Sequence, residues 1–87
     1  MKRLRLRAWR RGTREMDLIL GPYADALPDD TVAADLDAIE RLMDENDQDL
    51  YRWITGAEPA PPGFTDLTDR IAQATLARLG RAHAQGA

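Results

Sequence analysis

Apolar residues recur along this chain at intervals of three and four, which is the spacing of one face of an α-helix. The clearest stripe places four apolar positions at i, i+3, i+4 and i+7, before Gly21-Pro22 begins to close the helix. Its members are Met16, Ile19, Leu20 and Tyr23. No stretch alternates apolar and polar residues as a half-buried strand would. The pattern therefore predicts an all-α fold.

The same spacing predicts a helix on each side of that stripe. A short first helix is expected from Arg3 to Trp9, with one apolar side and one arginine-rich side. A third helix is expected to open at Pro28-Asp29-Asp30, where an aspartate can cap or complement the helix N-terminus. The expected core face of the third helix consists of Val32, Leu36, Ile39 and Met43.

The second half of the chain predicts two more helices joined by an extended connector. Asn46 or Asp47 fits the N-cap of a fourth helix, and Gly56 fits its C-terminal cap. The stretch AEPAPPG (57–63) contains three prolines, which have no backbone donor, so it should be extended. Thr65 is the expected cap of a long last helix. One expected face of this helix consists of Leu67, Ile71, Thr75 and Leu79, and Ala72 and Leu76 widen it.

Together these segments predict a compact bundle of five helices, one domain over residues 1–87 with an ordered core from about 3 to 80 and a frayed C-terminal end. A chain of this size buries only about 60–65% of its unfolded surface, too little for a deep catalytic cleft. Trp9 is expected to anchor the core because it keeps helical spacing with apolar neighbours. The other expected core residues are Met16, Ile19, Leu20, Leu36, Ile39, Leu50, Trp53, Ile71 and Leu76.

Charge is divided unevenly, although the net charge is only −3. Seven of the twelve basic residues lie in the first 14 positions, and all fifteen acidic residues come at or after Glu15, so the N-terminal end suits an anionic neighbour. An arginine-rich, acid-poor start also occurs in mitochondrial transit peptides, but the helical domain begins at once and we expect no cleavable segment. With no cysteine and no apolar run of membrane-spanning length, a bacterial cytoplasm is the expected compartment and no membrane insertion is expected.

The inventory of reactive side chains does not indicate an enzyme. The single histidine, His83, lies near the C-terminal end without a neighbouring acid to orient it, so we expect a solvated side chain. Acidic pairs such as Asp29/Asp30 and Asp44/Glu45 lack the ligand spacing of a calcium loop, and the six glycines are too scattered for a phosphate loop. We therefore expect no catalytic residue, no metal site and no cofactor.

The basic first helix leaves nucleic-acid binding as an alternative, because Lys and Arg side chains on one face can bind phosphates. Three features argue against this alternative. The chain is acidic overall, it has no recognised DNA- or RNA-binding signature, and only one aromatic residue, Trp9, lies near the basic cluster.

The densest cluster of charge is RRGTREMD, residues 10–17. On a helix, Arg11 and Glu15 would lie on one face with Gly12 beside them. A glycine inside a helix costs about 0.5–1 kcal/mol relative to alanine, a loss that makes sense where another backbone must approach closely. The alternative is a surface ion pair worth a few tenths of a kcal/mol, with the glycine at a helix start. We interpret the cluster as a protein-docking surface.

The stretch RRGTREMDLILGPYA resembles the RGxxE region of the succinate dehydrogenase flavinylation factors, small assembly factors of the SdhE type. Arg11, Gly12 and Glu15 stand at the named positions, and Asp17 follows in the usual place. A second stretch, DENDQDLYRWITG, resembles the acidic turn and Asp-x-Asp-Leu-x-x-Trp of the same family. It is matched by Asp47, Asp49, Leu50 and Trp53. Two departures affect only helix starts, Gln48 where proline is common and Pro28 where a serine cap is usual.

The resemblance implies a five-helix protein, monomeric when free, that binds the flavoprotein subunit of succinate dehydrogenase and often that of fumarate reductase. It promotes covalent attachment of FAD to a histidine of that subunit by favouring a conformation in which flavin and histidine are aligned. The client carries the FAD, and the factor itself has no catalytic group. The implied partner-binding residues are Arg10, Arg11, Gly12, Arg14, Glu15 and Asp17.

The resemblance also implies a role for each of these side chains. Gly12 would permit close approach, Arg11 and Arg14 would face acidic or carbonyl groups of the client, and Glu15 and Asp17 would accept hydrogen bonds or order the arginines. Some relatives have been labelled antitoxins, so an antitoxin-like module stands beside nucleic-acid binding as an alternative. The sequence leaves open whether fumarate reductase is also a client and whether the protein binds free FAD.

Overall fold

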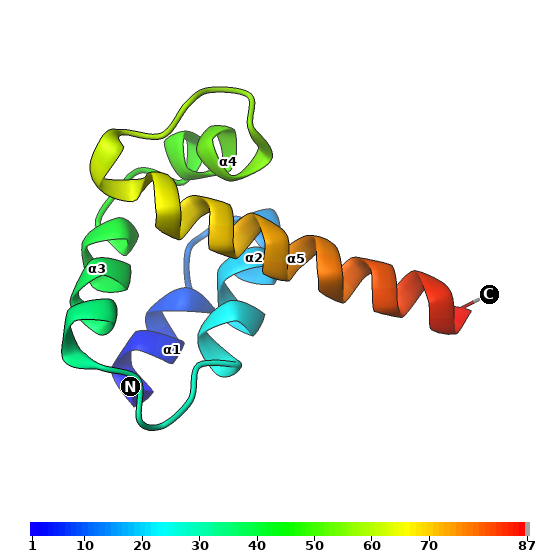
Figure 1. The fold of residues 1–87 in the computed structure, drawn as a ribbon, viewed down its shortest axis with the longest axis horizontal. Coiled ribbons are helices and arrows are strands. Elements are labelled where there is room, and N and C mark those ends of the chain that lie inside the picture. The colour runs from blue at the N-terminus through cyan, green and yellow to red at the C-terminus, as the bar shows by residue number, and fades with distance from the viewer. Residues whose placement is uncertain (87) are drawn as a thin grey trace.

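The computed structural model describes the backbone of residues 1–86 and the side chains of residues 1–80. The described chain contains five α-helices and one short 3-10 helix and no strand, which confirms the predicted all-α fold. In Figure 1, α5 crosses the molecule, with α4 on one side of it, α1 and α2 on the other, and α3 at one end. The elements are α1 (Lys2–Ala8), α2 (Arg14–Asp25), α3 (Ala33–Met43), α4 (Asp47–Thr55), η1 (Pro62–Phe64) and α5 (Thr65–Gly86).

Local chemistry sets the helix ends, in part as the sequence predicts. Asn46 caps α4, its side-chain oxygen accepting from the backbone N–H of Gln48 at 2.8 Å, and Gly56 ends that helix with a φ of 83°. The predicted start of the third helix at Pro28 is wrong, because α3 begins at Ala33 without a side-chain cap. Residues 28–31 form a separate turn instead, in which the backbone N–H and hydroxyl of Thr31 both donate to the carbonyl of Pro28.

Helix α2 does not close at Gly21-Pro22 as expected but continues to Asp25, with Pro22 inside it. A proline has no N–H, so the carbonyl four residues earlier loses its helical partner. Here that carbonyl belongs to Leu18, and Arg78 of α5 donates to it at 2.8 Å. The long last helix therefore supplies the hydrogen bond that Pro22 removes, which permits the helix to pass through the proline.

The core lies where α1, α2, α3 and α4 meet the first half of α5. Of the predicted core residues, Met16, Leu20, Ile39, Leu50 and Ile71 are buried, and Ile19, Leu36 and Trp53 are partly buried against them. Leu4, Ala8 and Ile54, which helical spacing places among the apolar residues of the first and fourth helices, are also buried. The sequence reading missed the burial of Ala24, Leu42 and the hydroxyl-bearing Thr68.

Three residues predicted to lie on core faces are exposed. Leu76 and Leu79 on α5 are 62% and 58% exposed, and Val32 is 59% exposed. Figure 1 shows the reason for the first two, because the second half of α5 extends past the other helices. Val32 lies before the first turn of α3 and so belongs to no helical face. The α5 backbone continues through Gly80 to Gly86, and fraying of the C-terminal end stays a prediction.

Trp9 does not anchor the core as predicted. It follows the last residue of α1 and is 40% exposed, and its ring lies against the backbone of Gly21. A Cβ atom on Gly21 would approach the indole ring to 2.4 Å, so a residue with a side chain does not fit there without moving the ring. The indole N–H donates to a carboxylate oxygen of Asp25 at 3.0 Å. Trp9 thus fastens the end of α1 to the second half of α2.

Candidate docking surface

The segment 10–13 forms a turn between α1 and α2, and Gly12 has a φ of 95° at its tip. Because Thr13 is the N-cap of α2 and accepts weakly from the backbone N–H of Met16 at 3.4 Å, the helix starts only at Arg14. The expectation of Arg11, Gly12 and Glu15 on one helical face is therefore wrong. Gly12 serves the left-handed bend, a conformation that residues with a Cβ disfavour.

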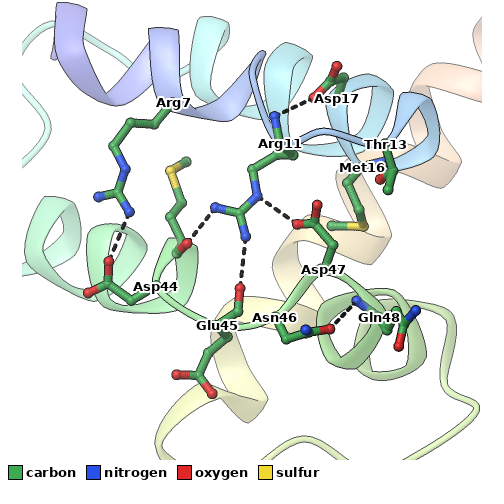
Figure 2. Close-up of polar contacts among 11 residues, drawn as sticks. Arg7, Arg11, Thr13, Met16, Asp17, Asp44, Glu45, Asn46, Asp47 and Gln48 are labelled. Atoms are coloured by element: carbon green, nitrogen blue, oxygen red, sulfur yellow. Dashed lines mark hydrogen bonds and ion pairs between the residues drawn. The ribbon is translucent and has the colours of Figure 1, made fainter.

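The side chain of Arg11 turns inward and holds the connection between α3 and α4 (Figure 2). Its Nε donates to Oδ1 of Asp47 at 2.7 Å, and one terminal nitrogen donates to the carbonyl of Glu45 at 2.8 Å. The other terminal nitrogen donates to the carbonyl of Met43. The Arg11 and Asp47 side chains are only 10% and 16% exposed. We call this set of contacts the Arg11 clamp.

The Arg11 clamp satisfies groups that the helices leave without partners. Met43 is the last residue of α3, and the last carbonyls of a helix receive no hydrogen bond from within the helix. The planar guanidinium spreads its donors over three nitrogens in fixed directions, whereas the three donors of a lysine all lie on one nitrogen. Asp47 lies in the first turn of α4, where the positive end of the helix dipole stabilises its carboxylate. One arginine therefore joins the two stretches that carry the family resemblance, residues 10–24 and 44–56.

Asp17 fixes the same turn from the other side. Its Oδ1 accepts from the backbone N–H of Arg11 at 2.7 Å, which ties the turn to the first turn of α2. Of the six residues expected to bind a partner, Arg11 and Asp17 are thus engaged within the chain, and Arg11 does not pair with Glu15. The other four are exposed: Arg10, Gly12, Arg14 and Glu15.

Next to the exposed turn lies a surface hollow of about 440 Å³, which we call the α4-side hollow. Glu15 borders it from α2, and Tyr51, 45% exposed, borders it from α4. Sequence reasoning missed Tyr51, although its spacing of four residues from Asp47 places both on one helical face. The complete lining consists of Thr13, Glu15, Met16, Asp47, Gln48, Tyr51 and Arg52.

The other matched residues of the second stretch support α4. Leu50 is buried, and the ring of Trp53 stacks on Phe64 with centroids 6.0 Å apart. Asp49 forms an ion pair with Arg52 on the surface of the same helix. These residues set the position of α4, and hence of Asp47 and Tyr51, relative to the turn.

Within the part of the chain that the structure describes, no group of three His, Cys, Asp or Glu side chains is placed to hold a metal ion. Over the same residues, no helix combines the length and the apolar character needed to cross a membrane. The side chain of His83, expected to be solvated, lies outside the described residues.

These features define a small helical protein with an exposed, charged turn between α1 and α2 that buried Arg11 and Asp47 hold in place. Residues 2–75 match the model of the Sdh5 family, described as flavinator of succinate dehydrogenase. The chain belongs to this family, which confirms the resemblance noted in its sequence.

Curated relatives agree with the family match. The chain is 35% identical over 80 residues to the FAD assembly factor SdhE of Acetobacter pasteurianus, covering 91% of this chain and 73% of that protein. It is 35% identical over 63 residues to the SdhE of Methylococcus capsulatus, covering 71% and 76%. It is 40% identical over 71 residues to the mitochondrial succinate dehydrogenase assembly factor 2 of Scheffersomyces stipitis, covering 76% of this chain but only 48% of that protein. No solved structure matches the chain.

Proposed function

We propose that this protein is an assembly factor that binds the flavoprotein subunit of succinate dehydrogenase and promotes covalent attachment of FAD to it. The family match and the names of the relatives support this role. The structural observation that carries it is the exposed turn at Gly12, which the buried Arg11 clamp holds from beneath. A partner would meet Arg10, Gly12, Arg14 and Glu15 in one fixed arrangement.

The chain would act through binding and not through chemistry of its own. Because the turn is fixed before binding, little ordering cost falls on the association. Arg10 and Arg14 offer guanidinium donors, and Glu15 offers a carboxylate acceptor, so each can form charge-assisted hydrogen bonds with the subunit. The absence of a side chain on Gly12 lets the backbone of the subunit come close. Arg11 and Asp17 would act indirectly, as positioning residues of this surface.

Binding of this kind accelerates flavin attachment only if it favours one state of the subunit. A ligand shifts a conformational equilibrium by the difference between its affinities for the two states. We propose that the factor binds the conformation in which the flavin lies against the histidine that receives it, and that the subunit carries the FAD. We further propose that the free factor is a monomer in the bacterial cytoplasm and has no enzymatic activity, and that the flavoprotein subunit of fumarate reductase is a second client.

Replacement of Glu15 by alanine tests the proposal. Glu15 is exposed, and its carboxylate accepts no hydrogen bond and forms no ion pair with any described group, so Glu15→Ala should change the melting temperature little. Loss of one partner of a buried interface contact costs about 2–5 kcal/mol of binding free energy, which corresponds to at least a thirtyfold weaker complex. The subunit is expressed with each variant in a strain without another copy of the factor, then denatured, and flavin fluorescence that stays with the polypeptide is measured.

Glu40→Ala is the matched control, because Glu40 is an exposed glutamate on α3. We expect full covalent flavin with Glu40→Ala and a loss of most of it with Glu15→Ala. Equal covalent flavin with both variants would show that the exposed turn is not the docking surface. Substituting the fumarate reductase subunit in the same assay tests the second client.

A further inference from the structure

The arginines from Arg3 to Arg11 fall into two groups, and the side chains of the first group bond to other groups of the chain. Arg5 donates from Nε to the carbonyl of Ala24 at 3.2 Å and from a terminal nitrogen to that of Leu27 at 3.0 Å, which caps the end of α2. Arg7 pairs with Asp44 at 2.8 Å, and Arg11 forms the clamp with Asp47. Contacts within the fold therefore account for these three arginines, and no partner is needed to explain their presence.

The second group has no such explanation. Arg3 and Arg10 are exposed and form no ion pair or hydrogen bond through their side chains with any described group. They border a hollow of about 290 Å³ in which all the charged lining residues are arginines. We call it the α1-side hollow, and its lining consists of Arg3, Leu6, Arg7, Arg10 and Arg11.

The sequence keeps these cations together at a cost. Arg3 and Arg7 are four residues apart on α1, a spacing at which like charges destabilise a helix by a few tenths of a kcal/mol. Leu6 lies between them and is 51% exposed, so an apolar surface is surrounded by guanidinium groups. A bound anionic segment with an apolar side chain would offset both unfavourable features.

The α1-side hollow borders the surface already assigned to the partner. Arg11 lines the α1-side hollow and Asp47 lines the α4-side hollow, and the two side chains are 2.7 Å apart in the clamp. Arg10 belongs to the α1-side hollow and lies two residues before Gly12 in the exposed turn. A protein seated on the turn would therefore extend over the α1-side hollow.

We propose that the α1-side hollow binds a short acidic segment of the flavoprotein subunit, whose carboxylates pair with Arg3 and Arg10 while an apolar side chain contacts Leu6. This inference rests on the proposed function and adds to it a second contact and the chemistry of the segment that fills it. Arginine suits the task because its guanidinium binds a carboxylate through two parallel hydrogen bonds.

The surroundings favour a short carboxylate segment over a nucleic acid. On the far side of Arg7, a neighbouring hollow has three carboxylates in its lining, those of Asp37, Glu40 and Asp44, against the two guanidinium groups of Arg7 and Arg41. This excess of negative charge would disfavour a continuing phosphate backbone. Nucleic-acid binding draws its affinity from many phosphate contacts in a row. The α1-side hollow offers few free cations, on a chain whose net charge is −3. Such a site fits two or three carboxylates.

A carbodiimide cross-link tests the contact directly, because this reagent joins a carboxylate to an amine only when the two groups touch. Lys2→Arg first removes the single lysine of the chain. Into that background we introduce Arg3→Lys in the α1-side hollow or, as the control, Arg70→Lys at an exposed position on α5. Both substitutions keep the charge. Each variant is mixed with the purified flavoprotein subunit, treated with carbodiimide and mapped by mass spectrometry.

We expect the amine introduced at position 3 to be joined to an aspartate or glutamate of the subunit, in a yield at least several times that of the Arg70→Lys control. In a second measurement, Arg3→Glu should raise the dissociation rate constant of the complex about tenfold, whereas Arg70→Glu should leave it unchanged. The Arg70→Lys and Arg70→Glu controls distinguish a direct contact in the complex from long-range electrostatic attraction, because long-range attraction changes mainly the association rate constant.

Three outcomes would overturn the inference while the proposed function stands. The first is equal cross-linking by both variants in a complex that forms and flavinylates normally. The second is cross-linking of position 3 to a carboxylate of another copy of this chain. The third is binding of a 20-nucleotide RNA at the same ionic strength that Arg3→Glu abolishes, together with unchanged binding of the subunit. If the unsubstituted chain does not bind the subunit at all, both proposals fail.

Discussion

Two exposed bends of this protein contain a glycine with a left-handed backbone, and they are held in different ways. Gly56, with a φ of 83°, ends α4, and its N–H donates to the carbonyl of Trp53. The stack of Trp53 on Phe64 then packs the following connector against the helix. Gly12, with a φ of 95°, has no such apolar support, and buried charge holds its turn through Arg11 and Asp47.

The difference is consistent with the docking role proposed for the Gly12 turn. A helix end needs only local backbone hydrogen bonds and a glycine, and apolar packing fixes it at low cost. A surface that presents charged side chains to a partner has little apolar area with which to attach itself to the core. Arg11 solves this by reaching under the turn to the carbonyls and the carboxylate of the α3–α4 connection. Its neighbours on the turn are left free to face solvent.

The largest effect is expected at the second bend. Trp53→Ala removes a large, partly buried ring and its stack on Phe64, which should lower the free energy of unfolding by about 3–4 kcal/mol. In so small a domain this loss is a large part of the total stability. Thermal and urea unfolding of the purified variant measure it. Trp53→Phe retains an aromatic ring and should lose less than half as much, and an unchanged melt of Trp53→Ala would show that the bend does not depend on the stack.

A slightly smaller loss is expected at the first bend. Arg11→Ala leaves the Asp47 carboxylate and two carbonyls without their donor, at a cost of about 2–3 kcal/mol in urea unfolding. Arg7→Ala is the control, because its ion pair with Asp44 is exposed and should contribute less than about 1 kcal/mol. Arg11→Lys should recover little, since an ammonium cannot reach all three acceptors. Equal losses for Arg7→Ala and Arg11→Ala would contradict the view that the clamp holds the turn.

The smallest effect on folding, and the sharpest contrast in function, is expected from the two glycines. Asparagine tolerates left-handed backbone better than other residues with a side chain, so Gly12→Asn and Gly56→Asn should each cost less than about 1 kcal/mol in unfolding free energy. An ideal Cβ at either position meets no atom within 4 Å in the free protein. Covalent flavin on the subunit should fall only with Gly12→Asn. Similar covalent flavin with both variants would place the partner elsewhere.

The sequence predicted the parts of the fold that depend on neighbouring residues. The cap at Asn46, the end of α4 at Gly56 and the stripe through Met16 and Leu20 all follow from local chemistry and spacing. Periodicity failed at Leu76, because it predicts a helix and its apolar side but not the length of core available to cover that side. The start of α3 was misplaced because Thr31 and Pro28 form a turn that competes with the helix.

The charge cluster and the resemblance together select residues 10–17 as the candidate surface, and that assignment stays a prediction. The geometry of this segment was not predicted. The sequence could not show that Arg11 points inward, because its acceptors lie in a segment more than thirty residues away. Nor could the sequence show whether Gly12 lies in a helix or has a positive φ, because glycine adopts both conformations readily. The contact of Trp9 with Gly21 was missed because the two residues belong to different segments that only the folded structure brings together.

The reach of the Arg11 clamp has a consequence for the order of events during folding. Its acceptors on Met43, Glu45 and Asp47 are 32, 34 and 36 residues further along the chain. Contacts over such separations form only after the intervening chain has been brought together. A chain still emerging from the ribosome, or one that has formed only α1 and α2, would therefore lack the shaped turn at Gly12. A client that recognises this turn would ignore incomplete factors and bind only chains whose first half has reached its final structure.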